Sequence, residues 1–138
     1  IFSFLALVTF SFAQLKTIEK KHPIIEGCQK INTKDQIAVK TCFDNKMQEL
    51  IQAELINLAS ELETIEANSV NVKIRFNTSK EAKINKFHVL TSSDKEFGEV
   101  IKKAIQQVTS NLNMLDPALN EEGDPISSVM ISEYEFKK

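Results

Sequence analysis

Apolar and polar residues recur along the chain with two different periods, and these periods predict its helices and strands. Apolar residues return every three or four positions from Phe43 to Leu62, which predicts an amphipathic helix. Thr33 and Gln36 have the spacing of a capping box, so we expect this helix to begin at Thr33. Its end is expected between residues 62 and 68. The apolar stripe consists of Phe43, Met47, Leu50, Ile51, Leu55 or Ile56, Leu58 and Leu62.

The period then changes to two. From Val70 to Phe76, apolar residues alternate strictly with polar ones, which predicts a half-buried strand. A turn over residues 77–80 leads to a second strand over residues 83–90, and the two should form an antiparallel hairpin. The alternation slips between Ile84 and Phe87, which predicts a β-bulge there.

A second helix and a last strand follow. Ser93 and Glu96 form another capping-box pattern ahead of a regular apolar stripe, and Asp116-Pro117 ends the helical pattern. An acidic turn over residues 120–125 then leads to a final strand over residues 126–136. The stripe of this second helix consists of Phe97, Val100, Ile101, Ala104, Ile105, Val108 and Leu112.

This order of elements predicts an α+β fold. An N-terminal helix is followed by β-β-α-β, and a three-stranded antiparallel sheet with the helices on one face would bury every apolar stripe. We expect one domain over residues 33–138, preceded by a leader over residues 14–32. A sheet of three strands has two open edges.

The first thirteen residues, Ile1 to Ala13, carry no charge and end in Ser11-Phe12-Ala13. The small residues at this exit favour a truncated signal peptide over residues 1–13 and an exported chain. The alternative is the end of a membrane-spanning helix, which needs about 20 apolar residues. With the signal removed, the chain has no membrane span, and it would act in the periplasm, on the cell surface or outside the cell.

Cys28 and Cys42 are the only cysteines. In an oxidising compartment an even pair is most simply a disulfide, and closing a loop of about 15 residues would stabilise the fold by ~3 kcal/mol. One alternative is a catalytic thiol with His22 or His88 as its base, but no neighbouring residue would lower the pKa of a thiol. The other is zinc, for which the spacing is unsuitable.

The charge balance narrows the function. The chain has 17 basic and 19 acidic residues, so nothing favours nucleic acid or an anionic membrane. Glu61, Glu63 and Glu66 are best interpreted as a solvated helix end. Without a phosphate-binding loop, a nucleophile motif or a ligand cluster, we expect no catalytic residues, no metal and no cofactor.

From Val70 onward the sequence resembles the C-terminal domain of TonB, the energy transducer of outer-membrane uptake in Gram-negative bacteria. The resemblance is carried by the strand 70–76, the segment Val89-Leu90-Thr91-Ser92, the amphipathic helix, Pro117-Ala118, Gly123-Asp124-Pro125-Ile126 and the ending Glu135-Phe136. Upstream, residues 23–28 and Cys42-Phe43 are similar to the extension of secreted TonB-like proteins of Bacteroidetes.

Three family features differ in this chain. Met114 and Leu115 occupy the region where the family usually has a Trp before Pro-Ala. Ala82 stands near the glycine of the first hairpin turn, and no Tyr-Pro follows the first helix. The resemblance therefore implies a divergent member of the family.

The resemblance also implies a function, namely binding of an extended peptide or protein, such as a segment of an outer-membrane receptor, by strand addition. We expect the last strand to provide the edge, with a peptide-binding set of Ser127, Val129, Ile131, Glu133, Tyr134, Glu135 and Phe136. Because only a short polar stretch separates Ala13 from His22, we expect a stand-alone binding module rather than a transmitter of force.

Two alternatives to peptide binding stay open. In one, the last strand is a solvated edge that Glu133, Glu135 and the terminal lysines protect from pairing. In the other, the chain is a self-associating structural protein, with a homodimer formed through its open edges or the first helix.

Overall fold

The computed structural model describes residues 19–138, so the predicted signal peptide over residues 1–13 lies outside the described part. The elements follow in the order β1 (Glu19–Lys21), β2 (Ile24–Ile25), α2 (Gln36–Glu54), the 3-10 helix η1 (Leu55–Leu58), α3 (Ala59–Leu62), β3 (Ser69–Thr78), β4 (Ile84–Ser92), α4 (Lys95–Asn111), β5 (Met114–Asp116), β6 (Ala118–Asn120), β7 (Pro125–Ile126) and β8 (Ser128–Lys137). No helix within residues 19–138 is long and apolar enough to span a bilayer.

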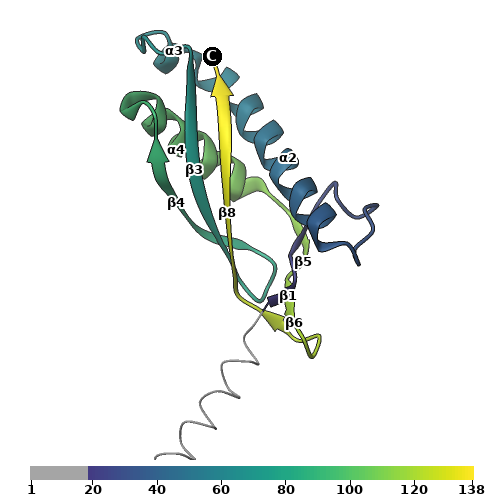
Figure 1. Ribbon diagram of the computed structural model, residues 1–138. Coiled ribbons are helices and arrows are strands. Elements are labelled where there is room, and N and C mark those ends of the chain that lie inside the picture. The colour runs from purple at the N-terminus through teal and green to yellow at the C-terminus, as the bar shows by residue number, and fades with distance from the viewer. Residues whose placement is uncertain (1–18) are drawn as a thin grey trace, which may run out of the picture.

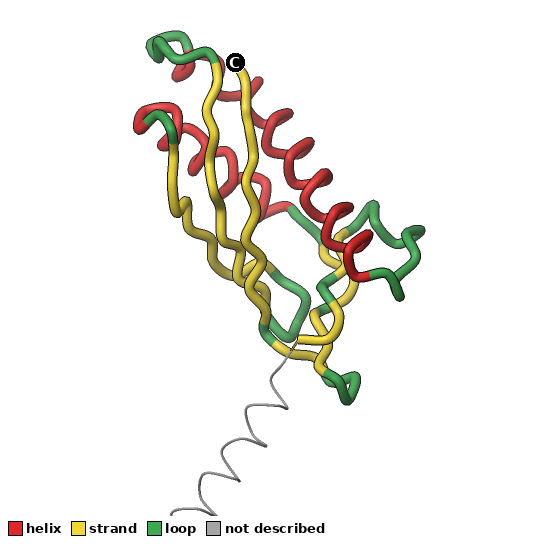
Figure 2. Tube along the Cα trace, in the orientation of Figure 1, coloured by secondary structure: helices red, strands yellow, loops and turns green. Residues whose placement is uncertain are grey.

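The main sheet confirms the predicted α+β class. It has three antiparallel strands in the order β4-β3-β8, so β3 is central and the other two are edges. Helices α2 and α4 cover one face of this sheet, and the other face is left open (Figures 1 and 2). The alternation that predicted β3 places Val70, Val72, Ile74 and Phe76 against the helices, each at most 2% exposed.

The β3–β4 hairpin carries the predicted bulge and a second one. Asn77 pairs with Lys86 and Thr78 pairs with Ile84, so Asn85 is the extra residue within the predicted interval. A further shift between Lys73 and Ile74 makes Leu90 an extra residue. In the turn, Ala82 adopts a φ of 58°, in the region that favours glycine.

Both predicted capping residues were wrong. Asp35, not Thr33, caps α2 by accepting a hydrogen bond from Ala38 N at 3.1 Å. Asp94, not Ser93, caps α4 by accepting from Phe97 N at 2.8 Å. Each aspartate has an extended backbone, and its carboxylate accepts a hydrogen bond from the amide three residues further along the chain. The negative carboxylate also interacts favourably with the positive end of the helix dipole.

The first helix is also interrupted. The α-helical geometry ends at Glu54, and η1 and the short α3 continue the chain to Leu62. The change in winding decides between the two apolar candidates at this point, because Leu55 is 3% exposed whereas Ile56 is 77% exposed.

Four short strands, β1, β2, β5 and β6, were not predicted. β2 pairs with β5, and β6 pairs with both β1 and β7, all antiparallel. These pairings tie residues 19–25 to the connection between α4 and β8, and Ile25 is fully buried. The predicted final strand over residues 126–136 is divided at Ser127 into β7 and the longer β8.

The core lies between the sheet and the helices. At its centre, the rings of Phe43 from α2 and Phe76 from β3 meet edge to face with centroids 5.9 Å apart. The largest fully buried side chains are Phe43, Phe76, Phe97, Phe136, Ile25, Met47, Ile51, Ile74, Ile101, Ile105, Met130 and Val70.

Candidate functional site

The candidate site is the outer edge of β8. This strand pairs with β3 without interruption from Ser128 opposite Thr78 to Lys137 opposite Ser69. No strand within residues 19–138 pairs with its other side, and α2 runs alongside it instead (Figure 1). An edge strand of this kind has unpaired backbone groups available to another chain.

Hydrogen bonds from α2 identify which residues of β8 point outward. Gln52 Nε2 donates to the carbonyl of Lys137 at 2.6 Å, and Gln52 Oε1 accepts from the amide of Lys137 at 3.0 Å. Gln48 Nε2 donates to the carbonyl of Glu135 at 2.7 Å. Because peptide groups alternate in direction along an antiparallel strand, the odd-numbered residues from Val129 to Lys137 direct theirs away from β3.

These glutamines belong to a polar stripe on α2. Its members recur at every fourth position, so they lie in one line beside the buried line of Val39, Phe43, Met47 and Ile51. All members are half-buried, and each forms a hydrogen bond with another part of the chain. We define this polar stripe as Gln36, Lys40, Asp44, Gln48 and Gln52.

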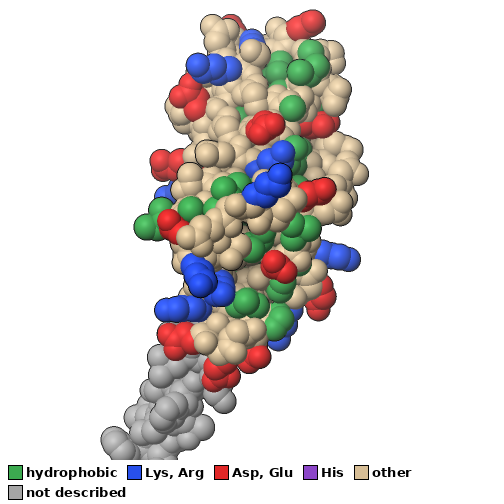
Figure 3. Space-filling model, turned by 90° about the vertical axis from the view of Figure 1, so that its right-hand side faces the viewer, with side chains coloured by type: hydrophobic (Ala, Val, Ile, Leu, Met, Phe, Trp, Pro, Cys, Tyr) green, Lys and Arg blue, Asp and Glu red, His purple; other side chains and the backbone are tan. Residues whose placement is uncertain are grey.

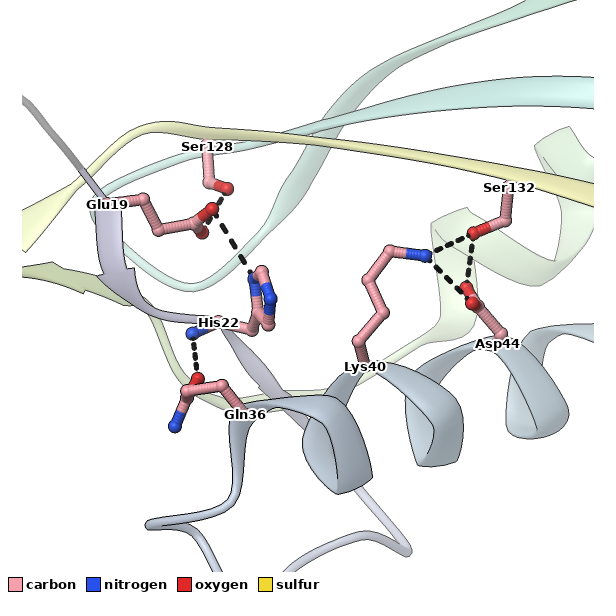
Figure 4. A network of polar contacts seen from close by, with 7 residues as sticks. All are labelled: Glu19, His22, Gln36, Lys40, Asp44, Ser128 and Ser132. Carbon is pink, nitrogen blue, oxygen red and sulfur yellow. Dashed lines mark hydrogen bonds and ion pairs between the residues drawn. The ribbon is translucent and has the colours of Figure 1, made fainter.

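Asp44 and Lys40 form the middle of the stripe and contact β8 (Figure 4). Lys40 Nζ lies 2.7 Å from Ser132 Oγ and 2.8 Å from the carboxylate of Asp44. Asp44 also accepts hydrogen bonds from Ser132 Oγ at 2.5 Å and from the phenol of Tyr134 at 3.3 Å. The cluster therefore fixes α2 on β8 through charge-assisted hydrogen bonds.

The Lys40–Ser132 pair does not have the arrangement of a nucleophile and its base. A lysine that activates serine must be neutral and accept the serine proton. Here the ammonium donates to Ser132, and the serine proton is directed to Asp44.

Burial, together with the negative charge of Asp44, raises the pKa of the Tyr134 phenol above its ordinary value.

The N-terminal end of β8, at Ser128, contacts β1. Ser128 Oγ donates to the carboxylate of Glu19, which lies 3.4 Å from Nδ1 of His22 (Figure 4). The amide of His22 donates to Gln36 Oε1 at 2.6 Å, which joins this corner to the polar stripe.

The residues predicted for peptide binding divide into three groups. Ser127 lies before β8 and is exposed. The side chains of Val129, Ile131, Glu133 and Glu135 are exposed on the open face. Tyr134 and Phe136 point to the helices and are 5% and 0% exposed, so their side chains belong to the core. A partner at this edge would contact the exposed group and the outward backbone.

The open face of the sheet also carries a pair of basic side chains. Arg75 on β3 pairs across the strands with His88 on β4. Partial burial, then the positive charges of Arg75 and Lys86, lower the pKa of His88 below its ordinary value.

Cys28 and Cys42 form the predicted disulfide, with their Cα atoms 6.0 Å apart. It connects the segment before α2 to the first half of this helix. Because both sulfurs are bonded, the alternative of a free catalytic thiol is wrong. Within residues 19–138, no group of three or more His, Cys, Asp or Glu side chains is arranged to hold a metal ion.

Sequence reasoning missed the polar stripe, although its signal is present. The sequence predicted an amphipathic helix and assigned no contact to its polar positions, whereas Gln48 and Gln52 bind the backbone of β8. Polar residues at four-residue spacing, immediately beside the apolar line, are the pattern that would have identified a second contact surface.

No known protein family, characterised protein or solved structure matches the chain, so the resemblance to the TonB domain stays a prediction.

Proposed function

We propose that the chain is an exported, non-enzymatic binding module that takes an extended peptide or protein segment by strand addition at the outer edge of β8. The observation that supports this proposal most directly is the state of the outward backbone groups of Val129, Ile131 and Glu133. Within residues 19–138, no hydrogen bond reaches these groups. An extended segment beside β8 would satisfy them in a regular ladder.

The comparison of the two edges favours β8 over β4. The register of β4 is interrupted by bulges at Asn85 and Leu90, and bulges twist an edge away from further pairing. β8 pairs with β3 over ten residues without a bulge, so its outer edge keeps a regular spacing of donors and acceptors. β8 is therefore the better of the two edge strands for strand addition.

The surface charge also fits recognition through the backbone. On the side where α2 lies, basic and acidic side chains are interspersed, with hydrophobic side chains between them (Figure 3). No field of one sign is available there to hold a charged polymer. Backbone pairing, with neighbouring side chains setting specificity, needs no such field.

The disulfide supports export, because such bonds persist in oxidising compartments. Together with the resemblance to the TonB domain, this connects the module to outer-membrane uptake. The proposed partner is an extended segment of an outer-membrane receptor on its periplasmic side.

The test uses synthetic peptides from such receptor segments and isotope-labelled protein followed by NMR. Two N-methylated forms of each peptide are compared, with methyl groups on alternate residues in one phase or the other. One phase removes the amide hydrogens that face β8, and its matched control removes only those that face away. We expect shifts in the amides of residues 129–133, and loss of binding in one phase only.

Unchanged amides over residues 127–136 with all peptides would contradict the proposal, as would equal binding by both methylated forms. Sedimentation across a range of protein concentrations controls for pairing of β8 with a second copy. A dimer that peptides cannot dissociate would favour the self-associating alternative.

A further inference from the structure

The outer edge of β8 is divided into two halves by the polar stripe of α2. Gln48 and Gln52 already bind the outward groups of Glu135 and Lys137, at 2.6 to 3.0 Å. The outward groups of Val129, Ile131 and Glu133 have no such partner within residues 19–138. We call residues 129–133 the open half-edge and residues 135–137 the capped half-edge.

Other parts of the fold limit the length of the open half-edge at both of its ends. At one end, Ser128 is 8% exposed and bonded to Glu19, so β1 occupies the space before Val129. At the other end, the side chain of Gln48 lies where a neighbouring strand would pass. At 3.4 Å per residue, the space between them suits an extended segment of about five residues.

Side chains on the open face define the chemistry of that segment. Val129 and Ile131 are 52% and 44% exposed, and they form the apolar border of the open half-edge. Side chains of an added strand that lie on this face would contact them, and apolar or β-branched residues gain most from such contacts. Glu133, which is exposed at the far end, favours a basic residue beside it.

The helix-facing border is different. There, an added strand would meet Lys40, Asp44 and Ser132, which are polar and bonded to one another. An apolar side chain would not find an apolar wall at this border, whereas a hydroxyl or amide side chain can join the hydrogen bonds. The two borders together favour alternation of apolar and polar residues in the ligand.

We propose that the open half-edge selects an extended segment of about five residues, alternately apolar and polar, with a basic residue beside Glu133. In this proposal Gln48 and Gln52 are specificity-determining residues, because they end the ladder at Glu133 and exclude longer pairing. The inference rests on the proposed function, since it defines the ligand of the same edge.

The probes are two synthetic peptides, a five-residue Ile-Thr-Val-Thr-Lys and a nine-residue form that continues the alternation, both blocked at their ends. Amide shifts and affinity are measured by NMR on the unchanged protein and on Gln48→Ala/Gln52→Ala. The matched control is Gln106→Ala/Gln107→Ala, which removes two exposed glutamines of α4. Exchange of the lysine in the peptide for glutamate tests the contribution of Glu133.

In the unchanged protein and in the control, we expect both peptides to shift residues 129–133 with similar affinity. In the double variant, the nine-residue peptide should extend its shifts to Glu135 and Lys137 and bind about tenfold more tightly, as one or two added hydrogen bonds allow. The glutamate peptide should bind about threefold to tenfold more weakly.

Shifts through Lys137 in the unchanged protein, or no extension in the double variant, would overturn the inference and leave strand addition standing. Equal affinity of the lysine and glutamate peptides would remove the charge preference. Failure of every peptide to shift any residue of β8, in either protein, would instead remove the proposed function itself.

Discussion

Loss of the disulfide between Cys28 and Cys42 should destabilise the fold mainly through the unfolded state. The cysteines are 14 positions apart, and a cross-link that closes a loop of about 15 residues stabilises a protein by ~3 kcal/mol in the chain-entropy model. Reduction keeps both sulfur atoms in place, so we expect it to lower the free energy of unfolding by about 3 kcal/mol.

Substitution by alanine adds a packing cost. Cys28 is 3% exposed, and removal of its sulfur loses buried apolar volume comparable to a methylene group, which is worth ~0.8 kcal/mol. The variant Cys28→Ala/Cys42→Ala should therefore lose about 4 kcal/mol. Alanine is preferred to serine, because a buried hydroxyl would add a desolvation cost.

Urea unfolding, followed by circular dichroism, measures both effects. The slope of the free energy against urea concentration should rise when the cross-link is lost, because the unfolded chain then exposes more surface. Reducing agent should leave the double variant unchanged, which controls for other effects of the reagent. A loss below about 1 kcal/mol, on reduction and in the double variant alike, would refute the reasoning that the loop is held chiefly by its cross-link.

Three further predictions concern the sheet and its contacts. Asp44→Asn should lower the pKa of the Tyr134 phenol because it removes the nearby negative charge. Absorbance titration measures this pKa without interference, because the chain has one Tyr and no Trp. An unchanged pKa would contradict the contact between Asp44 and Tyr134. Because the pKa of His88 is lowered in the fold, the unfolded chain binds the proton more readily, and the free energy of unfolding should fall as pH drops below 6.5. Arg75→Gln should raise the pKa of His88, which an NMR titration of this histidine measures. An unchanged titration would exclude the effect of the Arg75 charge. Ala82→Gly should raise the free energy of unfolding by about 0.5 to 1 kcal/mol, since glycine accommodates the positive φ, and a decrease on thermal unfolding would argue against strain in this turn.

The elements that the sequence predicted well are those that bury one face over several repeats. The alternation from Val70 to Phe76 lies within β3, and the stripe that begins at Phe97 lies on α4. Each pattern is long enough to define a period, and the same apolar residues that carry it form the core. The slip between Ile84 and Phe87 was likewise readable, because a bulge shifts the alternation by one residue.

The elements that were missed depend on contacts across the fold. Strands of two or three residues, such as β2, have no period, and they form because Ile25 is buried where the chain returns at β5. The polar stripe is different, because its four-residue spacing is visible in the sequence but the strand that it contacts is not. Nothing local to Gln48 or Gln52 indicates that the last strand lies beside them, so the division of the edge follows only from the tertiary arrangement.

The order in which the strands of the main sheet follow one another along the chain has a consequence for how the sheet assembles. Gln52 and Lys137, which hydrogen bond to each other, are separated by 85 positions, and β3 lacks one of its two neighbours until β8 has been synthesised. A hairpin of β3 and β4 alone is at best marginally stable. The sheet therefore stays incomplete until residues 128–137 have been added, so a truncation within β8 should destabilise the whole domain and not that strand alone.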